Sequence, residues 1–131
     1  MWKQLSLAFF ISLIAALPVF TGHTSAAADI SGTWNFSVDL DGGGHGDPIF
    51  VFKQKGEKLT GTYNGPLGEY KVTGTVTGAK AVFGFDFKNA DLAGKATYTA
   101  TIESPTKMNG TVEFIDNGGN ERGKWTAIKK E

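Results

Sequence analysis

Hydrophobic and polar residues alternate with a period of two from Ser31 onward, and turn-forming residues interrupt the alternation every eight to twelve positions. This pattern is typical of short antiparallel strands with one buried face, and no stretch has a convincing helical period. The pattern predicts eight strands, at residues 31–40, 49–55, 59–64, 70–77, 81–88, 95–103, 108–116 and 122–129.

Each predicted strand has one apolar face and one face rich in polar residues, mostly Thr and Lys. In the first strand, Trp34 and Phe36 begin an apolar face that continues at every second position. Residues 49–55 start apolar on both faces, so their phase is ambiguous. Asp86 precedes Phe87 in a strand whose other face is aromatic, and we expect its carboxylate to point outward.

Eight strands with one apolar face each must bury those faces together. An open sheet would leave its apolar face in water and two edges unpaired. Closure removes both problems, and an eight-stranded interior holds side chains or one small ligand. We therefore predict an all-β fold, an eight-stranded antiparallel up-and-down β-barrel. A two-sheet sandwich is the alternative, and the short connections argue against it.

The predicted connections alternate in length. Those reading GEK, GAK and SPT are short, whereas DGGGHGDP, NGPLGE, NADLAG and NGGNE are longer. Alternate connections of an up-and-down barrel lie at the same end. The sequence thus predicts one tightly closed end and one end with every long, glycine-rich loop, where a binding site is expected.

The N-terminus has the pattern of a secretory signal peptide. Lys3 precedes an apolar run over residues 5–20, and Ala26 and Ala28 stand in A-x-A register before Asp29. A charged start, a short apolar segment and a small-residue exit together predict cleavage near Ala28. An uncleaved N-terminal anchor is the alternative, but the run is shorter than the about 20 residues of a membrane span.

Cleavage there divides the chain into a signal peptide, residues 1–28, and a single β-barrel domain, residues 29–131, that is secreted or periplasmic. The absence of Cys excludes a lipid-anchored lipoprotein and thiolate chemistry. Loss of Lys3 leaves 12 basic and 13 acidic residues, a balance that argues against nucleic acid or an anionic membrane as a partner. With His45 as the mature chain's single histidine, we expect no metal site, and nothing indicates a cofactor or a membrane span.

Two short motifs resemble those of the calycin group, which includes lipocalins and avidins. ISGTWNF contains the G-x-W of the first calycin strand, and LTGTYNG resembles a stretch of streptavidin-like proteins. The resemblance implies a barrel closed at the Trp34 end with a ligand cavity at the other. It also implies a basic residue of the last strand over Trp34, for which Arg122 or Lys124 is the candidate. It does not imply biotin, because Trp34 and Trp125 are the mature chain's only tryptophans.

The inward-facing residues nearest the predicted open end are the candidate pocket. Several are aromatic, and tyrosines favour a pocket because a buried hydroxyl needs a hydrogen-bond partner. The alternative is that these side chains simply fill the barrel. The candidates are Val38, Leu40, Tyr63, Tyr70, Phe85, Phe87, Tyr98 and Phe114.

His45 is a further candidate at this end. It lies in GGGHGDP near Asp39 and Asp47, and a His–Asp pair can act as a general base. The alternative is an exposed turn, since glycines flank His45 on both sides. The D-x-D-G-G-G run lacks the glutamate of a calcium loop, and no G-x-S-x-G or phosphate-binding glycine loop occurs.

Three functions fit these features. Binding of a small apolar or amphipathic ligand at the open end ranks first, and an interaction or inhibitor module acting through its loops with a filled barrel ranks second. A barrel cyclase or isomerase ranks third, because no cluster of residues indicates a reaction. The sequence specifies neither the ligand nor the oligomeric state.

Overall fold

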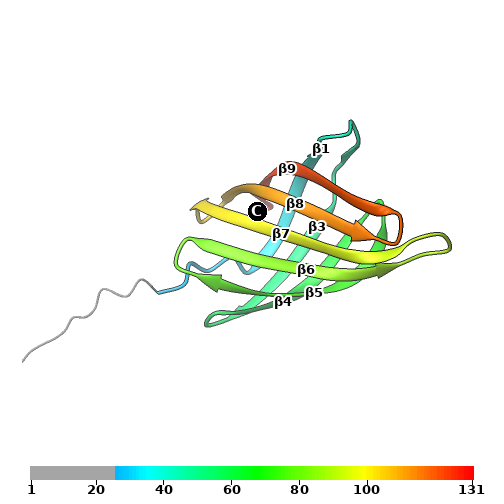
Figure 1. Ribbon diagram of the computed structural model, residues 1–131. Coiled ribbons are helices and arrows are strands. Elements are labelled where there is room, and N and C mark those ends of the chain that lie inside the picture. The colour runs from blue at the N-terminus through cyan, green and yellow to red at the C-terminus, as the bar shows by residue number, and fades with distance from the viewer. Residues whose placement is uncertain (1–25) are drawn as a thin grey trace, which may run out of the picture.

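The computed structural model describes residues 26–131, which form a closed antiparallel β-barrel (Figure 1). The predicted leader, residues 1–28, lies outside the described residues except for its last three. The strands are β1 Gly32–Leu40, β2 His45–Gly46, β3 Ile49–Lys55, β4 Lys58–Gly65, β5 Gly68–Thr77, β6 Lys80–Lys88, β7 Ala93–Ser104, β8 Lys107–Asp116 and β9 Gly119–Lys129.

The eight long strands follow one another in up-and-down order, and β1 pairs with β9 to close the barrel. That closing ladder runs from Trp34 opposite Lys129 to Leu40 opposite Gly123. The two-residue strand β2 is an addition, which pairs only with the last part of β1. The predicted fold class is confirmed, and no helix occurs within residues 26–131.

The strand phases also agree with the alternation. β3, whose phase was ambiguous, buries Phe50 and Phe52 and leaves Ile49 and Val51 exposed on the outer face. Burying the two rings removes more apolar surface from water than burying the smaller aliphatic pair. Asp86 is exposed, as expected for an outward-facing residue.

Glycines within the strands allow the sheet to bend. A β-carbon at Gly110 would overlap the carbonyl oxygen of Thr99 on β7, and one at Gly61 would overlap that of Val51 on β3. These glycines therefore bring neighbouring backbones closer than any other residue would permit, as sharp bends in a barrel require.

The prediction that every open-end connection is long is wrong for two of the four. The connection after β1 (residues 41–48, including β2) and that after β6 (residues 89–92) are long, but only two residues join β4 to β5 and β8 to β9. Glycines that the sequence assigned to loops belong to the strands. Gly65 of β4 pairs with Gly68 of β5, for example, so the connection between these strands is shorter than predicted.

The opposite end is closed by the segment that precedes β1. Ile30 is fully buried, and the Trp34 indole nitrogen donates to its carbonyl oxygen at 2.9 Å. The Gln54 amide donates to the Ala28 carbonyl (2.7 Å) and accepts from the Ile30 amide (2.9 Å). Ala28 donates its amide to the Gly78 carbonyl at 3.0 Å. Residues 28–30 are thus fastened across this end.

The expected basic partners of Trp34 are wrong. The basic residue opposite Trp34 is Lys129, because β9 continues past Arg122 and Lys124 to the closed end of the barrel. Arg122 lies at the other end of β9 and forms an ion pair with Glu113 at 3.1 Å. Lys124 lies opposite Asp39 and is exposed.

Large rings occupy the part of the barrel next to the closed end, called here the filled half. Phe36 stacks on Trp125 with ring centroids 4.7 Å apart, and Phe52 meets Phe83 edge-on at 4.9 Å. Phe50 packs 4.4 Å from Phe36. The filled half consists of Trp34, Phe36, Phe50, Phe52, Leu59, Val72, Val76, Ala81, Phe83, Met108 and Trp125, all buried.

Candidate functional site

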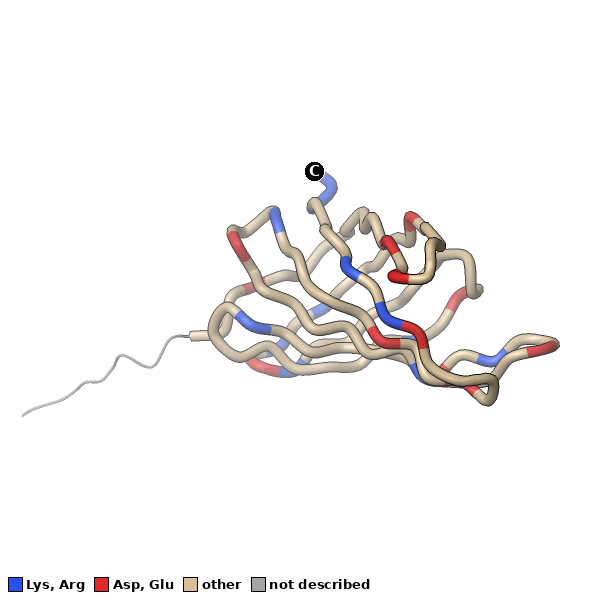
Figure 2. Tube along the Cα trace, turned by 45° about the horizontal axis from the view of Figure 1, so that its top comes forward, with Lys and Arg blue, Asp and Glu red and all other residues tan. Residues whose placement is uncertain are grey.

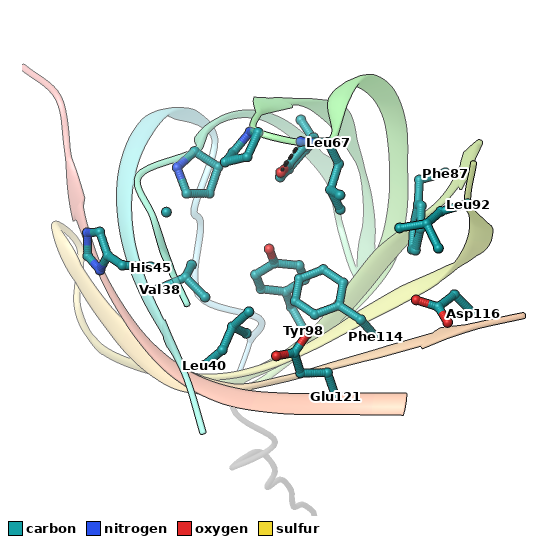
Figure 3. A pocket seen from close by; sticks show the side chains of 14 residues that line it. Val38, Leu40, His45, Leu67, Phe87, Leu92, Tyr98, Phe114, Asp116 and Glu121 are labelled. Carbon is teal, nitrogen blue, oxygen red and sulfur yellow. Dashed lines mark hydrogen bonds between the residues drawn. The ribbon is translucent and has the colours of Figure 1, made fainter. Parts of the chain in front are cut away.

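A cavity of about 180 Å³ opens at the end of the barrel opposite Trp34 (Figure 3). Seven of the nine strands contribute to it, together with the β4–β5 turn and the two long loops. Its lining residues are Val38, Leu40, His45, Gly46, Pro48, Tyr63, Pro66, Leu67, Phe87, Leu92, Tyr98, Phe114, Asp116 and Glu121.

Most of the pocket candidates from the sequence lie at this cavity. The structure brings together Val38, Leu40, His45, Tyr63, Phe87, Tyr98 and Phe114. Phe85 and Tyr70 do not line it. The Phe85 ring is buried against Tyr63, with centroids 4.3 Å apart. The Tyr70 hydroxyl donates to the Leu67 carbonyl at 2.9 Å and accepts from the Lys88 amide at 3.3 Å, so it fastens the β4–β5 turn to β6.

Seven further residues line the cavity that were not among the candidates from the sequence: Gly46, Pro48, Pro66, Leu67, Leu92, Asp116 and Glu121. Two carried a usable signal. Asp116 is in phase with the inward-facing Phe114, and Glu121 is in phase with the inward-facing Gly123 and Trp125. Extending the period of two by one step would have placed both carboxylates inside. The other five lie on loops, on a turn or on the two-residue β2, where no period exists.

Tyr98 of β7 contributes a buried hydroxyl that points into the cavity (Figure 3). The residue is 1% exposed, and its ring stacks on Phe83 with centroids 5.4 Å apart. Within residues 26–131 the hydroxyl makes no hydrogen bond to protein. Burial raises the pKa of Tyr98 well above its usual range, so the group stays a neutral donor. A buried hydroxyl without a partner is costly, and it is satisfied if water or a ligand accepts its proton.

Tyr63 of β4 contributes a second hydroxyl. Its oxygen accepts a long hydrogen bond of 3.4 Å from the Leu67 amide, shown dashed in Figure 3, and its proton has no acceptor within the described part of the chain. Burial raises the pKa of Tyr63 as well. Two protonated phenols therefore face the cavity, each with a proton to donate.

Apart from His45 at the rim, the ionisable acid and base side chains that line the cavity are carboxylates. Asp116 and Glu121 point inward on β8 and β9, and one Asp116 oxygen accepts from the Gly118 amide at 2.7 Å. Among the described lining residues none is Lys or Arg. The neighbouring loop adds acidic charge, since every Asp, Glu, Lys or Arg position from 39 to 48 is an Asp (Figure 2). The lining and this loop therefore carry more acidic than basic side chains.

His45 lies at the rim between two carboxylates. Its Nδ1 is 2.7 Å from the Asp39 carboxylate and its Nε2 is 3.0 Å from that of Asp47. Hydrogen bonds to Asp39 and then Asp47 raise the pKa of His45 above its usual value. Both ring nitrogens are occupied, so the geometry offers no free nitrogen for a general base. The segment is a short strand held by these bonds, rather than the unsupported turn that its glycines suggest.

Residues 26–131 contain no group of three or more His, Asp or Glu side chains arranged to hold a metal ion. Over the same residues, no helix is long and apolar enough to cross a membrane.

No protein-family profile and no curated protein matches this sequence. Among solved structures the chain is similar to EF1p2_mFAP2b bound to DFHBI (TM-score 0.59, 14% identity), covering 77% of this chain and 94% of that one. It is also similar to a redesigned β-barrel, b11L5F_LGL (TM-score 0.58, 16% identity, 78% and 92% covered). A third is a de novo designed fluorescence-activating β-barrel (TM-score 0.52, 15% identity, 76% and 93% covered). At these identities the similarity shows the fold alone, a small antiparallel β-barrel.

Proposed function

We propose that this protein is a secreted, calycin-like binding protein that takes up a small apolar or amphipathic molecule at the open end of its barrel. The observation that carries the proposal is the cavity of about 180 Å³ above the filled half, with mainly apolar walls and two hydroxyls that still have protons to donate. Concave, mostly apolar pockets with a few convergent polar groups are the usual sites for small ligands.

Two further points support binding over the alternatives. A barrel of similar fold, EF1p2_mFAP2b, was solved with the small molecule DFHBI bound to it. A loop-based interaction module would need no cavity, and a barrel enzyme would need an available base or nucleophile, whereas both nitrogens of His45 are engaged with carboxylates. The proposal that the protein is secreted is supported by the signal-peptide pattern of residues 1–28. N-terminal sequencing of protein recovered from outside the cytoplasm tests whether cleavage occurs near Ala28.

The test is native mass spectrometry of the full chain, expressed with its leader and exposed to an extract of the source culture. We expect a reproducible added mass that disappears on denaturation. Two variants locate the site. Val38→Phe adds a ring at a lining position and should abolish the adduct. Val82→Phe makes the same change on the outer face of β6, where Val82 is 46% exposed, and should retain the adduct.

An adduct that survives Val38→Phe would contradict binding in this cavity. Two negative results together would contradict the binding function: no adduct on the protein, and no change in the tryptophan emission of a purified Phe114→Trp variant when extract is added. They would favour a module that acts through its loops.

A further inference from the structure

We infer that the cavity selects ring-containing amines that carry a hydrogen-bond acceptor at the end opposite the amine. This inference rests on the proposed function and specifies the class of ligand. It comes from the placement of polar groups at two depths of one apolar cavity: carboxylates without a cationic partner at the mouth, and the unpartnered Tyr98 hydroxyl deeper inside.

The outer end of the cavity fits a cation. Asp116 and Glu121 face inward, and neither forms an ion pair with a Lys or Arg within residues 26–131. The basic groups at this end are directed elsewhere. Arg122 pairs with Glu113 on the outer face, His45 is held by Asp39 and Asp47, and Lys88 and Lys124 are exposed at outward positions. A ligand ammonium at this level would receive charge-assisted hydrogen bonds, whereas a ligand carboxylate would be repelled.

The inner end fits a hydrogen-bond acceptor. The Tyr98 hydroxyl is buried, points into the cavity and has no partner in the described residues. The Tyr63 hydroxyl lies nearer the mouth, where it accepts from the Leu67 amide of the β4–β5 turn. A carbonyl, ether or hydroxyl oxygen of a ligand would accept from Tyr98. The carboxylates do not meet this need, because they stand nearer the mouth.

The backbone positions of Tyr98 and Glu121 lie at neighbouring inward levels of the barrel wall. Tyr98 lies opposite Val112 in the β7–β8 ladder, and Glu121 lies opposite Phe114 in the β8–β9 ladder. Val112 and Phe114 are two residues apart on β8, or about 7 Å along a strand. Between these levels the walls are apolar, with Phe114, Leu40 and Val38 among them.

The volume limits the ligand to about one ring with short substituents. A cavity of about 150 Å³ lined by Leu, Ile and Phe binds benzene, and this one measures about 180 Å³ and is open at its mouth. A ring between the two levels, with an acceptor below and an amine above, fits both the size and the polar groups.

The experiment is isothermal titration calorimetry of the full chain at pH 7 and low ionic strength with four probes that share one ring. Tyramine has the phenol oxygen and the amine, phenethylamine lacks the oxygen, p-cresol lacks the amine, and 3-(4-hydroxyphenyl)propionate replaces the amine by a carboxylate. We expect tyramine to bind about fivefold or more tighter than p-cresol, and the carboxylate to bind more weakly than p-cresol. The preference for the amine should shrink as salt is raised.

Variants assign each end. Asp116→Asn with Glu121→Gln should remove the advantage of tyramine over p-cresol, and binding of p-cresol to this variant would show that the barrel is folded. Asp86→Asn removes an exposed carboxylate on the outer face and should change nothing. Tyr98→Phe should lower tyramine affinity to that of phenethylamine, without altering phenethylamine itself.

If p-cresol binds and the amine has no advantage, or the carboxylate probe binds best, the inferred ligand class is wrong while the binding function stands. The same holds if none of the four probes binds but the extract still yields a cavity-dependent adduct. Failure of all four probes together with absence of any adduct would overturn the binding function as well.

Discussion

The two halves of this barrel interior have the same alternation of inward and outward residues, but one half is filled by side chains and the other contains the cavity. Next to the closed end, rings from β1, β6 and β9 meet across the axis, with the Phe83 ring centroid 6.2 Å from that of Phe36 and 6.2 Å from that of Trp125. Toward the open end β1 presents the smaller Val38 and Leu40, and the other strands contribute two phenylalanines, two tyrosines and two carboxylates around a cavity. The period of two determines that there is a barrel, and the size of each inward residue determines whether it is hollow.

The largest expected effect is a difference in stability between substitutions in the filled half and substitutions beside the cavity. Phe83→Ala removes a ring that is 2% exposed and touches several others, and should lower the free energy of unfolding by about 3–5 kcal/mol. Leu40→Ala, at a half-buried position beside the cavity, should lower it by about 1 kcal/mol. Urea unfolding of both variants measures the difference. Equal losses would show that the open half is packed as tightly as the filled half.

Removing the hydroxyls of Tyr98 and Tyr70 should change protein stability by smaller amounts, and in opposite directions. Tyr98→Phe removes a buried hydroxyl without a partner and should stabilise the ligand-free protein by about 1 kcal/mol. Tyr70→Phe removes a hydroxyl bonded to Leu67 and Lys88 and should destabilise it by about 1 kcal/mol. Thermal unfolding of the two variants beside the parent checks the sign. A destabilised Tyr98→Phe would mean that its hydroxyl already has a partner.

The smallest effect concerns the rim. The pKa of His45 is raised above 6.5 by hydrogen bonds to Asp39 and Asp47. Since the folded pKa is the higher one, the contribution to stability is full below pH 6.5 and disappears as pH rises through the folded value. NMR titration of the imidazole should show the raised pKa, with a larger fall in Asp39→Asn than in Asp47→Asn. A pKa at or below 6.5 in the parent protein would refute the two contacts.

The fold could be predicted from sequence because burial repeats along every strand. Alternation determined the inward phase of seven strands, and the eighth, β3, was ambiguous only because Ile49 and Val51 are apolar yet outward. Loop length was harder. Asn64 and Glu69 resemble loop residues, but they pair with each other in the ladder and shorten the β4–β5 connection to two residues. Backbone pairing there outweighs local turn propensity.

The depth of each residue in the barrel could not be predicted. Phe85 and Phe87 are adjacent on one face of β6, but Phe87 lines the cavity and Phe85 does not. Depth depends on strand tilt and on the stagger between neighbouring strands, which a one-dimensional period does not contain. The same stagger places Lys129 rather than Arg122 opposite Trp34.

The position of the chain ends has a practical consequence. The end of β9 and the segment before β1 both lie at the closed end, where the Lys130 amide donates to the Thr33 carbonyl at 2.7 Å and the Ala28 amide donates to that of Gly78. A linker that leaves from either side would extend away from the mouth. The barrel can therefore be immobilised on a support or fused to another domain through either end with its entrance facing solution, an arrangement suited to a biosensor.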